Sequence, residues 1–79
     1  MRMITLQSTQ LASIGFDPGQ EILVAQFQNG SFYRYEGVPA ETYVAILTDD
    51  KSHGHVFNEL VKAKDFSFTK IEPSDVQAL

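Results

Sequence analysis

The sequence contains no cysteine, so neither a disulfide bond nor a thiolate metal site can stabilise the fold. Basic residues are also scarce, since six Lys and Arg stand against ten Asp and Glu and give a formal net charge of −4. Proteins that neutralise many phosphates of a nucleic acid, or that adhere to an anionic membrane surface, usually carry a basic excess. The charge therefore argues against both of these classes of protein.

Long apolar runs are absent as well. No run approaches the roughly 18–20 residues that a membrane span requires, and the polar residues after Arg2 do not form a signal peptide. We therefore predict no membrane partner and a cytoplasmic location. With 79 residues, of which 43% are hydrophobic, the chain has room for one globular domain over residues 1–79. Residues 72–79 are expected to form a loosely held tail of this domain or one frayed turn.

Alternating apolar residues predict three strands in the first half of the chain, over residues 11–16, 21–27 and 32–35, with Leu11 facing away from Ile14. The pair Asn29-Gly30 indicates a hairpin between the last two strands. A two-residue loop would place Tyr33 opposite Gln26, whereas a three-residue loop with glycine in the left-handed conformation would place it opposite Ala25. We favour the three-residue loop, because it gathers most apolar residues of both strands on one face: Leu23, Ala25, Phe27, Tyr33 and Tyr35.

The opposite face of this hairpin is unusually apolar for a surface in contact with solvent. It carries Ile22, Val24 and Phe32 together with Arg34. Large exposed apolar patches mark interaction sites. This face is therefore either covered by another part of the chain or forms an interface with a protein partner or a second copy.

The second half of the chain predicts two short helices and a last strand. Pro39 suits the first turn of a helix. Three apolar residues follow at helical spacing and form one stripe: Tyr43, Ile46 and Leu47. Ser52 is placed to cap a second helix with an apolar stripe from Val56 to Val61, and alternation predicts a final strand over 66–71. Strands followed by helices predict an α+β domain, with a small antiparallel sheet of three to four strands and two short helices packed on one face.

A series of motifs along residues 8–68 matches the pattern of a known family. The motifs are Ser8, Ile14-Gly15-Phe16-Asp17, Leu23, Ala25, Phe27, Asn29-Gly30, Tyr33-Arg34-Tyr35, Gly37-Val38-Pro39, Tyr43, Ser52, Gly54, Phe57 and Asn58. They resemble the KTSC domain, a short domain found at the C-terminus of some lysyl-tRNA synthetases and in free-standing small proteins of bacteria and phages. The resemblance implies RNA or a nucleotide-like ligand as the target, held by Tyr33, Tyr35, Ser52, Gly54 and Asn58.

The tyrosines of the third strand are the first candidates for ligand binding. Aromatic residues exposed on a sheet can stack nucleobases, so Tyr33 and Tyr35 would form a stacking platform. The alternative is that both are core residues. Arg34 lies on the opposite face, where it would pair either with a ligand anion or with Glu36 or Glu21.

The segment Ser52-His53-Gly54-His55 is the most suggestive for chemistry. A serine and a glycine at the start of a helix offer N–H groups to a phosphate or carboxylate, and a plain N-cap is the alternative. The chain has only two histidines to offer a metal, and no oxyanion loop is recognisable beside Ser52 and His55. We therefore predict no metal site, no cofactor and no catalysis.

These observations predict a non-catalytic binding module, and the family resemblance implies RNA or a nucleotide-like ligand as its target. Its candidate ligand-binding residues are Tyr33, Arg34, Tyr35, Ser52, Gly54 and Asn58. A second hypothesis is a protein–protein module, either an adaptor, an inhibitor or a homodimer, which would use Ile22, Val24 and Phe32. A third is a pocket that sequesters a small nucleotide metabolite.

Overall fold

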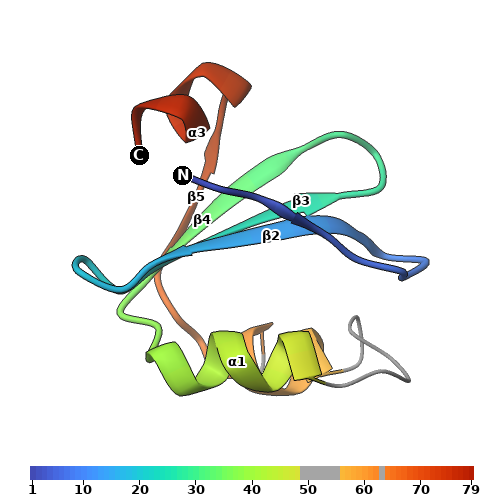
Figure 1. Ribbon diagram of the computed structural model, residues 1–79, viewed down its shortest axis with the longest axis vertical. Coiled ribbons are helices and arrows are strands. Elements are labelled where there is room, and N and C mark those ends of the chain that lie inside the picture. Colours follow the sequence, from blue (N-terminus) through green and yellow to red (C-terminus); the bar gives the residue numbers. More distant parts are fainter. Residues whose placement is uncertain (49–55, 63) are drawn as a thin grey trace.

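The computed structural model describes residues 1–48, 56–62 and 64–79. Its elements follow in the order β1 (Ile4–Thr5), β2 (Leu11–Asp17), β3 (Ile22–Phe27), β4 (Phe32–Glu36), α1 (Ala40–Thr48), η1 (Asn58–Lys62), β5 (Phe68–Ile71) and α3 (Pro73–Ala78). All five strands belong to one antiparallel sheet in the order β1-β2-β3-β4-β5 (Figure 1). The chain is thus an α+β domain, as the sequence predicts. It has more strands than expected, because β1 is only two residues long and leaves no alternating pattern.

The β3–β4 hairpin has the register that the three-residue loop predicts. Leu23 pairs with Tyr35 and Ala25 with Tyr33. The N–H of Phe27 donates to the carbonyl oxygen of Ser31 at 2.9 Å, which closes the loop. Gly30 has a φ of 91°, a left-handed conformation that glycine adopts without strain. The hairpin therefore places both tyrosines on the same face of the sheet.

Strand β2 departs from simple alternation. Its pairing with β3 shifts between Leu11 and Ser13, which is a β-bulge. As a result Leu11 and Ile14, predicted to face opposite ways, both lie fully buried in the main core. The prediction that they face opposite ways is therefore wrong. One extra residue in a strand turns the side chains before it to the other face of the sheet.

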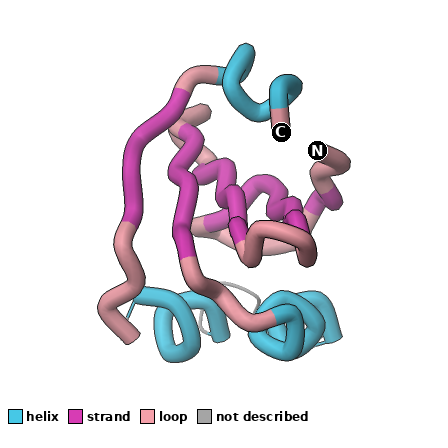
Figure 2. The backbone as a smooth tube through the Cα atoms, turned by 90° about the vertical axis from the view of Figure 1, so that its left-hand side faces the viewer, coloured by secondary structure: helices cyan, strands magenta, loops and turns pink. Residues whose placement is uncertain are grey.

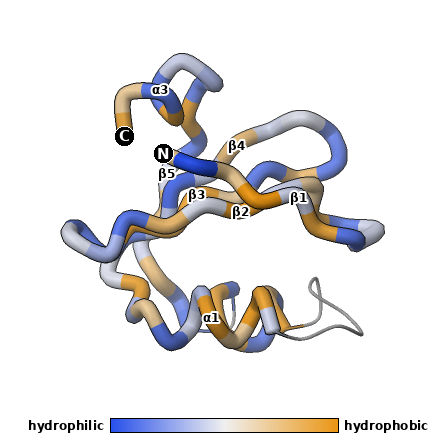
Figure 3. Tube along the Cα trace, in the orientation of Figure 1, coloured by the Kyte–Doolittle hydropathy of each residue, from blue (hydrophilic) through white to orange (hydrophobic). Residues whose placement is uncertain are grey.

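The main core lies between the sheet and two helical segments. Figure 2 shows α1 and residues 56–62 together on one side of the sheet and α3 on the other. Apolar residues mark α1 and the strands that face it, whereas the loops at the ends of the strands are hydrophilic (Figure 3). The buried members of this core are Leu6, Leu11, Ile14, Leu23, Ala25, Tyr35, Val38, Ile46, Phe57 and Val61. The two helical segments thus occupy one face, as predicted.

The other face of the sheet is covered by both ends of the chain. Residues 73–78 form α3 instead of a loose tail, and Val76 packs against Ile22 and Val24. The Glu72 and Asp75 side chains form a capping box at the start of α3. Ile22 and Val24 retain 2% and 0% of their exposure, so this face is covered by the chain itself, which is the first of the two alternatives that the sequence leaves open. Phe32 is half-buried beside them.

Gly15 lies directly against the N-terminal segment on this second face. A Cβ atom at this position would lie 2.7 Å from Met3 Sδ, 2.8 Å from the Arg2 carbonyl oxygen and 2.9 Å from Met1 Cγ. Atoms at such distances overlap. Residues 1–3 can therefore rest on β2 only because position 15 has no side chain.

Candidate functional site

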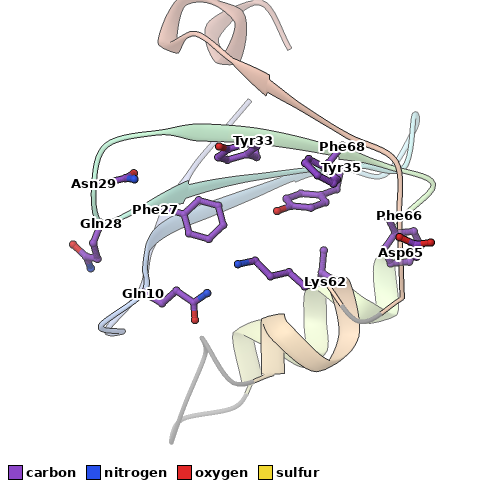
Figure 4. Close-up of a pocket in the computed structure, with 11 residues that line it drawn as sticks. Gln10, Phe27, Gln28, Asn29, Tyr33, Tyr35, Lys62, Asp65, Phe66 and Phe68 are labelled. Atoms are coloured by element: carbon purple, nitrogen blue, oxygen red, sulfur yellow. The ribbon is translucent and has the colours of Figure 1, made fainter.

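A pocket of about 620 Å³ opens between β3, β4, β5 and η1 (Figure 4). Its size falls within the range of about 300–1,000 Å³ that is typical of small-ligand sites. The lining residues are Gln10, Phe27, Gln28, Asn29, Tyr33, Tyr35, Val61, Lys62, Asp65, Phe66 and Phe68. Five of these residues are aromatic and five carry polar or charged side chains. Apolar walls with polar groups to orient the ligand are typical of sites for small organic molecules.

The aromatic wall is assembled by strand pairing. Tyr35 lies opposite Phe68 in the β4–β5 ladder, and their ring centroids are 5.8 Å apart. Tyr33 contacts Phe68 at 6.2 Å and Phe27 at 5.6 Å, both in edge-on geometry. Phe68 retains 63% of its exposure. The wall is thus a continuous aromatic surface that reaches solvent at Phe68.

One cation lies against this wall. The Lys62 Nζ atom is 5.1 Å from the centroid of the Phe27 ring, a cation–π contact. In Figure 4 its side chain extends from η1 into the space below Phe27 and beside Gln10. The ammonium group is therefore near the aromatic wall and accessible to an anionic group of a ligand.

Amide side chains form the remaining polar part of the site. Gln10 Nε2 donates to Asn58 Oδ1, and Asn58 Nδ2 donates to Gln10 Oε1, each at 3.2 Å. Gln28 Nε2 donates to the carbonyl oxygens of Ser8 and Leu11. This reciprocal pair of hydrogen bonds fixes Gln10 against η1. The amide groups of Gln10 and Asn58 each keep one N–H and one oxygen lone pair that can bond to a ligand.

The predicted site residues fall into three groups. Tyr33 and Tyr35 line the pocket, while Asn58 supports it through Gln10. Arg34 lies on the opposite face, because it alternates with the tyrosines along β4, and its Nη2 is 3.8 Å from Glu36 Oε1. Ser52 and Gly54, like the two histidines between and after them, lie outside the described residues, so their role stays a prediction.

Several lining residues were not predicted as site residues. From the sequence, Lys62 either complements the end of its helix or joins Lys64 and Lys70 in a small basic cluster that could follow an RNA backbone. Phe68 was expected only to alternate in a strand. Phe68 reaches the pocket because β5 pairs with β4 across more than thirty residues of sequence, whereas Lys62 reaches it from η1, against the Phe27 ring. The alternating Phe66-Ser67-Phe68 was the available signal, since it indicates a strand with both aromatic rings on one face.

Burial raises the pKa of Tyr35 above its ordinary value of 10.0, and the neighbouring Tyr33 raises it further. Burial also raises the pKa of Tyr43, an effect that Arg2 partly opposes. Because the folded protein holds these protons more tightly than the unfolded chain, their contribution to stability is fully present below the unfolded pKa. It is lost as the pH rises through the folded pKa.

We expect Tyr35→Phe to reduce the alkaline loss of stability. The free energy of unfolding of the unmodified chain should fall between about pH 9 and pH 11. The variant has one fewer phenol to ionise, so its loss over the same interval should be smaller. Urea denaturation at both pH values measures this difference. Equal losses in the two proteins would contradict a role for Tyr35.

No group of three or more His, Cys, Asp or Glu residues within 1–48, 56–62 and 64–79 is placed to hold a metal ion. In the same part of the chain, no helix is long and apolar enough to cross a membrane.

The antiparallel sheet, with two helical segments on one face and an aromatic pocket at their junction, places the chain among small α+β domains. The KTSC domain model matches residues 7–66, so the chain belongs to the KTSC domain family and the resemblance seen in its motifs is confirmed. The crystal structure of a KTSC domain protein from Yersinia pestis is similar, with a TM-score of 0.80 and 30% identity over 90% of this chain and 97% of that one.

Two relatives extend this comparison. A protein of Stutzerimonas stutzeri (strain A1501), described as uncharacterized, is 42% identical over 72 residues, which span 91% of this chain and 100% of that protein. A protein of Tsukamurella paurometabola is 32% identical over 62 residues, which span 78% of this chain and 91% of the relative. The domain described here therefore corresponds to almost the full length of both relatives.

Proposed function

We propose that this chain is a non-catalytic binding module for a nucleotide-like ligand. The planar base would rest against the aromatic wall of Phe27, Tyr33 and Phe68, and an anionic group would lie near Lys62. One observation carries the proposal: a single pocket combines a continuous aromatic surface with an accessible ammonium group.

The energetics of stacking support this choice. Contacts between a base and an aromatic side chain contribute about 1–3 kcal/mol per base and tolerate any base, because every base has a π-face. The Gln10 amide and the Asn29 side chain lie at the same pocket and offer hydrogen bonds to the edge of a base. These interactions suit one base with its phosphate, either as a free nucleotide or as an unstacked nucleotide of single-stranded RNA.

The charge of the chain favours a short ligand. Its net charge of −4 opposes the approach of a long polyanion. The charged side chains that line the described pocket are one lysine, Lys62, and one carboxylate, Asp65. We therefore propose contact with about one phosphate, which corresponds to a weak dependence of affinity on salt.

The absence of catalysis is part of the proposal. Among the described lining residues there is no serine, cysteine or histidine to act as a nucleophile or to activate one. A cytoplasmic location likewise remains a proposal, based on composition.

Lys62→Met tests the proposal directly. It retains an unbranched side chain and removes the charge, so the dissociation constant for adenosine 5′-monophosphate should rise about 3- to 10-fold. The matched control is Lys64→Met, because Lys64 is exposed and does not line the pocket. NMR titration of the backbone amides measures the affinities of both variants. A parallel titration with a short single-stranded RNA shows whether the protein binds a free nucleotide or a nucleotide of RNA more tightly.

The expected chemical-shift changes lie at Phe27, Tyr33 and Phe68. If neither ligand shifts these signals at concentrations up to about 10 mM, the proposal is wrong. Equal loss of affinity in the two methionine variants would show that the lysine charge acts over the whole surface and not in the pocket.

A further inference from the structure

The outer edge of β5 is the longer of the two free edges of the sheet. β1 and β5 are the terminal strands, with two and four residues. Phe68, Thr69 and Lys70 are all exposed. Figure 2 shows β5 along the outside of the sheet. An edge of this kind can pair with a further strand.

The register determines which backbone groups point outward. The N–H of Glu36 donates to the carbonyl oxygen of Ser67 at 3.0 Å, so these two residues form a hydrogen-bonded pair. Such pairs alternate along an antiparallel ladder, and hence Thr69 and Ile71 direct their backbone groups toward β4. Phe68 and Lys70 direct theirs away from the sheet.

We propose that two copies of this chain pair through β5, antiparallel, about a two-fold axis at Thr69. Phe68 of each copy then exchanges backbone hydrogen bonds with the partner subunit's Lys70. In this register the two residues of each β5 whose backbone groups point away from the sheet lie opposite the corresponding two residues of the other copy. The two sheets would join into one continuous sheet, with an isologous interface of the type common in dimers.

The side chains agree with this register. Residues that lie opposite one another share a face of the sheet, so Phe68 would lie beside the partner subunit's Lys70. An ammonium group near an exposed aromatic ring is favourable, because the ring face carries partial negative charge. A pairing centred on Lys70 would instead place two lysines directly opposite one another, which is destabilising.

The pairing also adds a charge to the pocket described above. Phe68 and Lys70 lie opposite Tyr35 and Tyr33, so their side chains are on the pocket face. The partner subunit's Lys70 would therefore lie at the mouth of the pocket beside Phe68. The pairing itself does not depend on ligand binding, and its test is separate.

Disulfide formation by Thr69→Cys tests the proposal, because the chain contains no other cysteine. Two residues at the two-fold axis form a non-hydrogen-bonded pair with a Cα separation of about 4.5 Å, within the range of about 4.4–6.8 Å for disulfides. K70C is the matched control, since its two thiols would be diagonal to one another and farther apart than about 7 Å. Ser74→Cys, exposed on α3, gives the rate of random collision.

We expect T69C to form covalent dimers at least about tenfold faster than K70C or S74C under mild oxidation. Comparable rates in the three variants would overturn the register. Sedimentation equilibrium of the unmodified chain should show a dimer, which Lys70→Pro should abolish by removing an outward N–H that makes no bond to β4. A monomer at every concentration up to about 1 mM would overturn the pairing and leave the edge free for a foreign strand.

Discussion

Replacing Phe57 with alanine is expected to lower the free energy of unfolding by about 3–5 kcal/mol. Phe57 is fully buried, and its ring meets Phe27 at 5.8 Å and Tyr35 at 5.5 Å in edge-on geometry. Removing the ring leaves a cavity between the sheet and η1. Because small domains have only about 0.05–0.15 kcal/mol of stability per residue, the loss is a large share of what a chain of 79 residues can have.

Urea denaturation followed by circular dichroism measures this loss. Phe68→Ala is the matched control, since it removes the same ring from a side chain that is 63% exposed. Its effect on unfolding should stay below about 1 kcal/mol. Similar losses in the two variants would show that Phe57 is not the centre of the core.

Gly15→Ala is expected to destabilise the domain by about 1–3 kcal/mol and to displace the N-terminal segment from β2. The added methyl group would meet the Arg2 carbonyl oxygen at 2.8 Å, and backbone cannot move aside as a flexible side chain can. Gly19→Ala is the control, because its Cβ would meet only the Asp17 carboxylate, at 3.3 Å.

A truncation tests whether Gly15→Ala destabilises the domain through residues 1–3 or because β2 accepts no larger side chain at this position. Deleting residues 1–3 removes all three atoms that the new methyl group would meet. The destabilisation caused by Gly15→Ala should therefore be much smaller in the truncated chain than in the full chain. If the urea midpoints show the same loss in both backgrounds, close packing against residues 1–3 is not its cause.

Local patterns determined the parts of the fold that were predicted correctly. Asn29-Gly30 and the apolar faces of the flanking strands favoured the observed hairpin register over the alternative with a two-residue loop, because a slip of one residue would have reversed every side chain. Pro39 and the stripe ending at Leu47 likewise predicted α1, of which Ile46 is the fully buried member.

Long-range contacts determined the parts that were not predicted. The six-residue helix α3 contains one buried residue, Val76, so its sequence carries no stripe. It forms because Ile22 and Val24, about fifty residues earlier, provide an apolar surface. The same contact explains why the apolar second face is covered, which is one of the two alternatives that the sequence left open.

The candidate site was predicted only in part, because some of its residues also depend on long-range contacts. Tyr33 and Tyr35 follow from the hairpin alone, and their dual role emerges from the structure: Tyr35 is buried in the core, while both rings border the pocket. Lys62 and Phe68 become site residues only when η1 and β5 pack beside β4. The alternation of Phe66 and Phe68 indicates a strand, but no pattern within either segment specifies that β5 will pair with β4 or that Lys62 will reach Phe27.

The two chain ends meet on the side of the sheet that faces away from the pocket. The Met1 ammonium group is 3.4 Å from the Val76 carbonyl oxygen, and both ends lie together in Figure 1. A neighbouring domain joined to either terminus would thus be anchored at the same place. A fusion at either end would therefore leave the mouth of the pocket open to solvent.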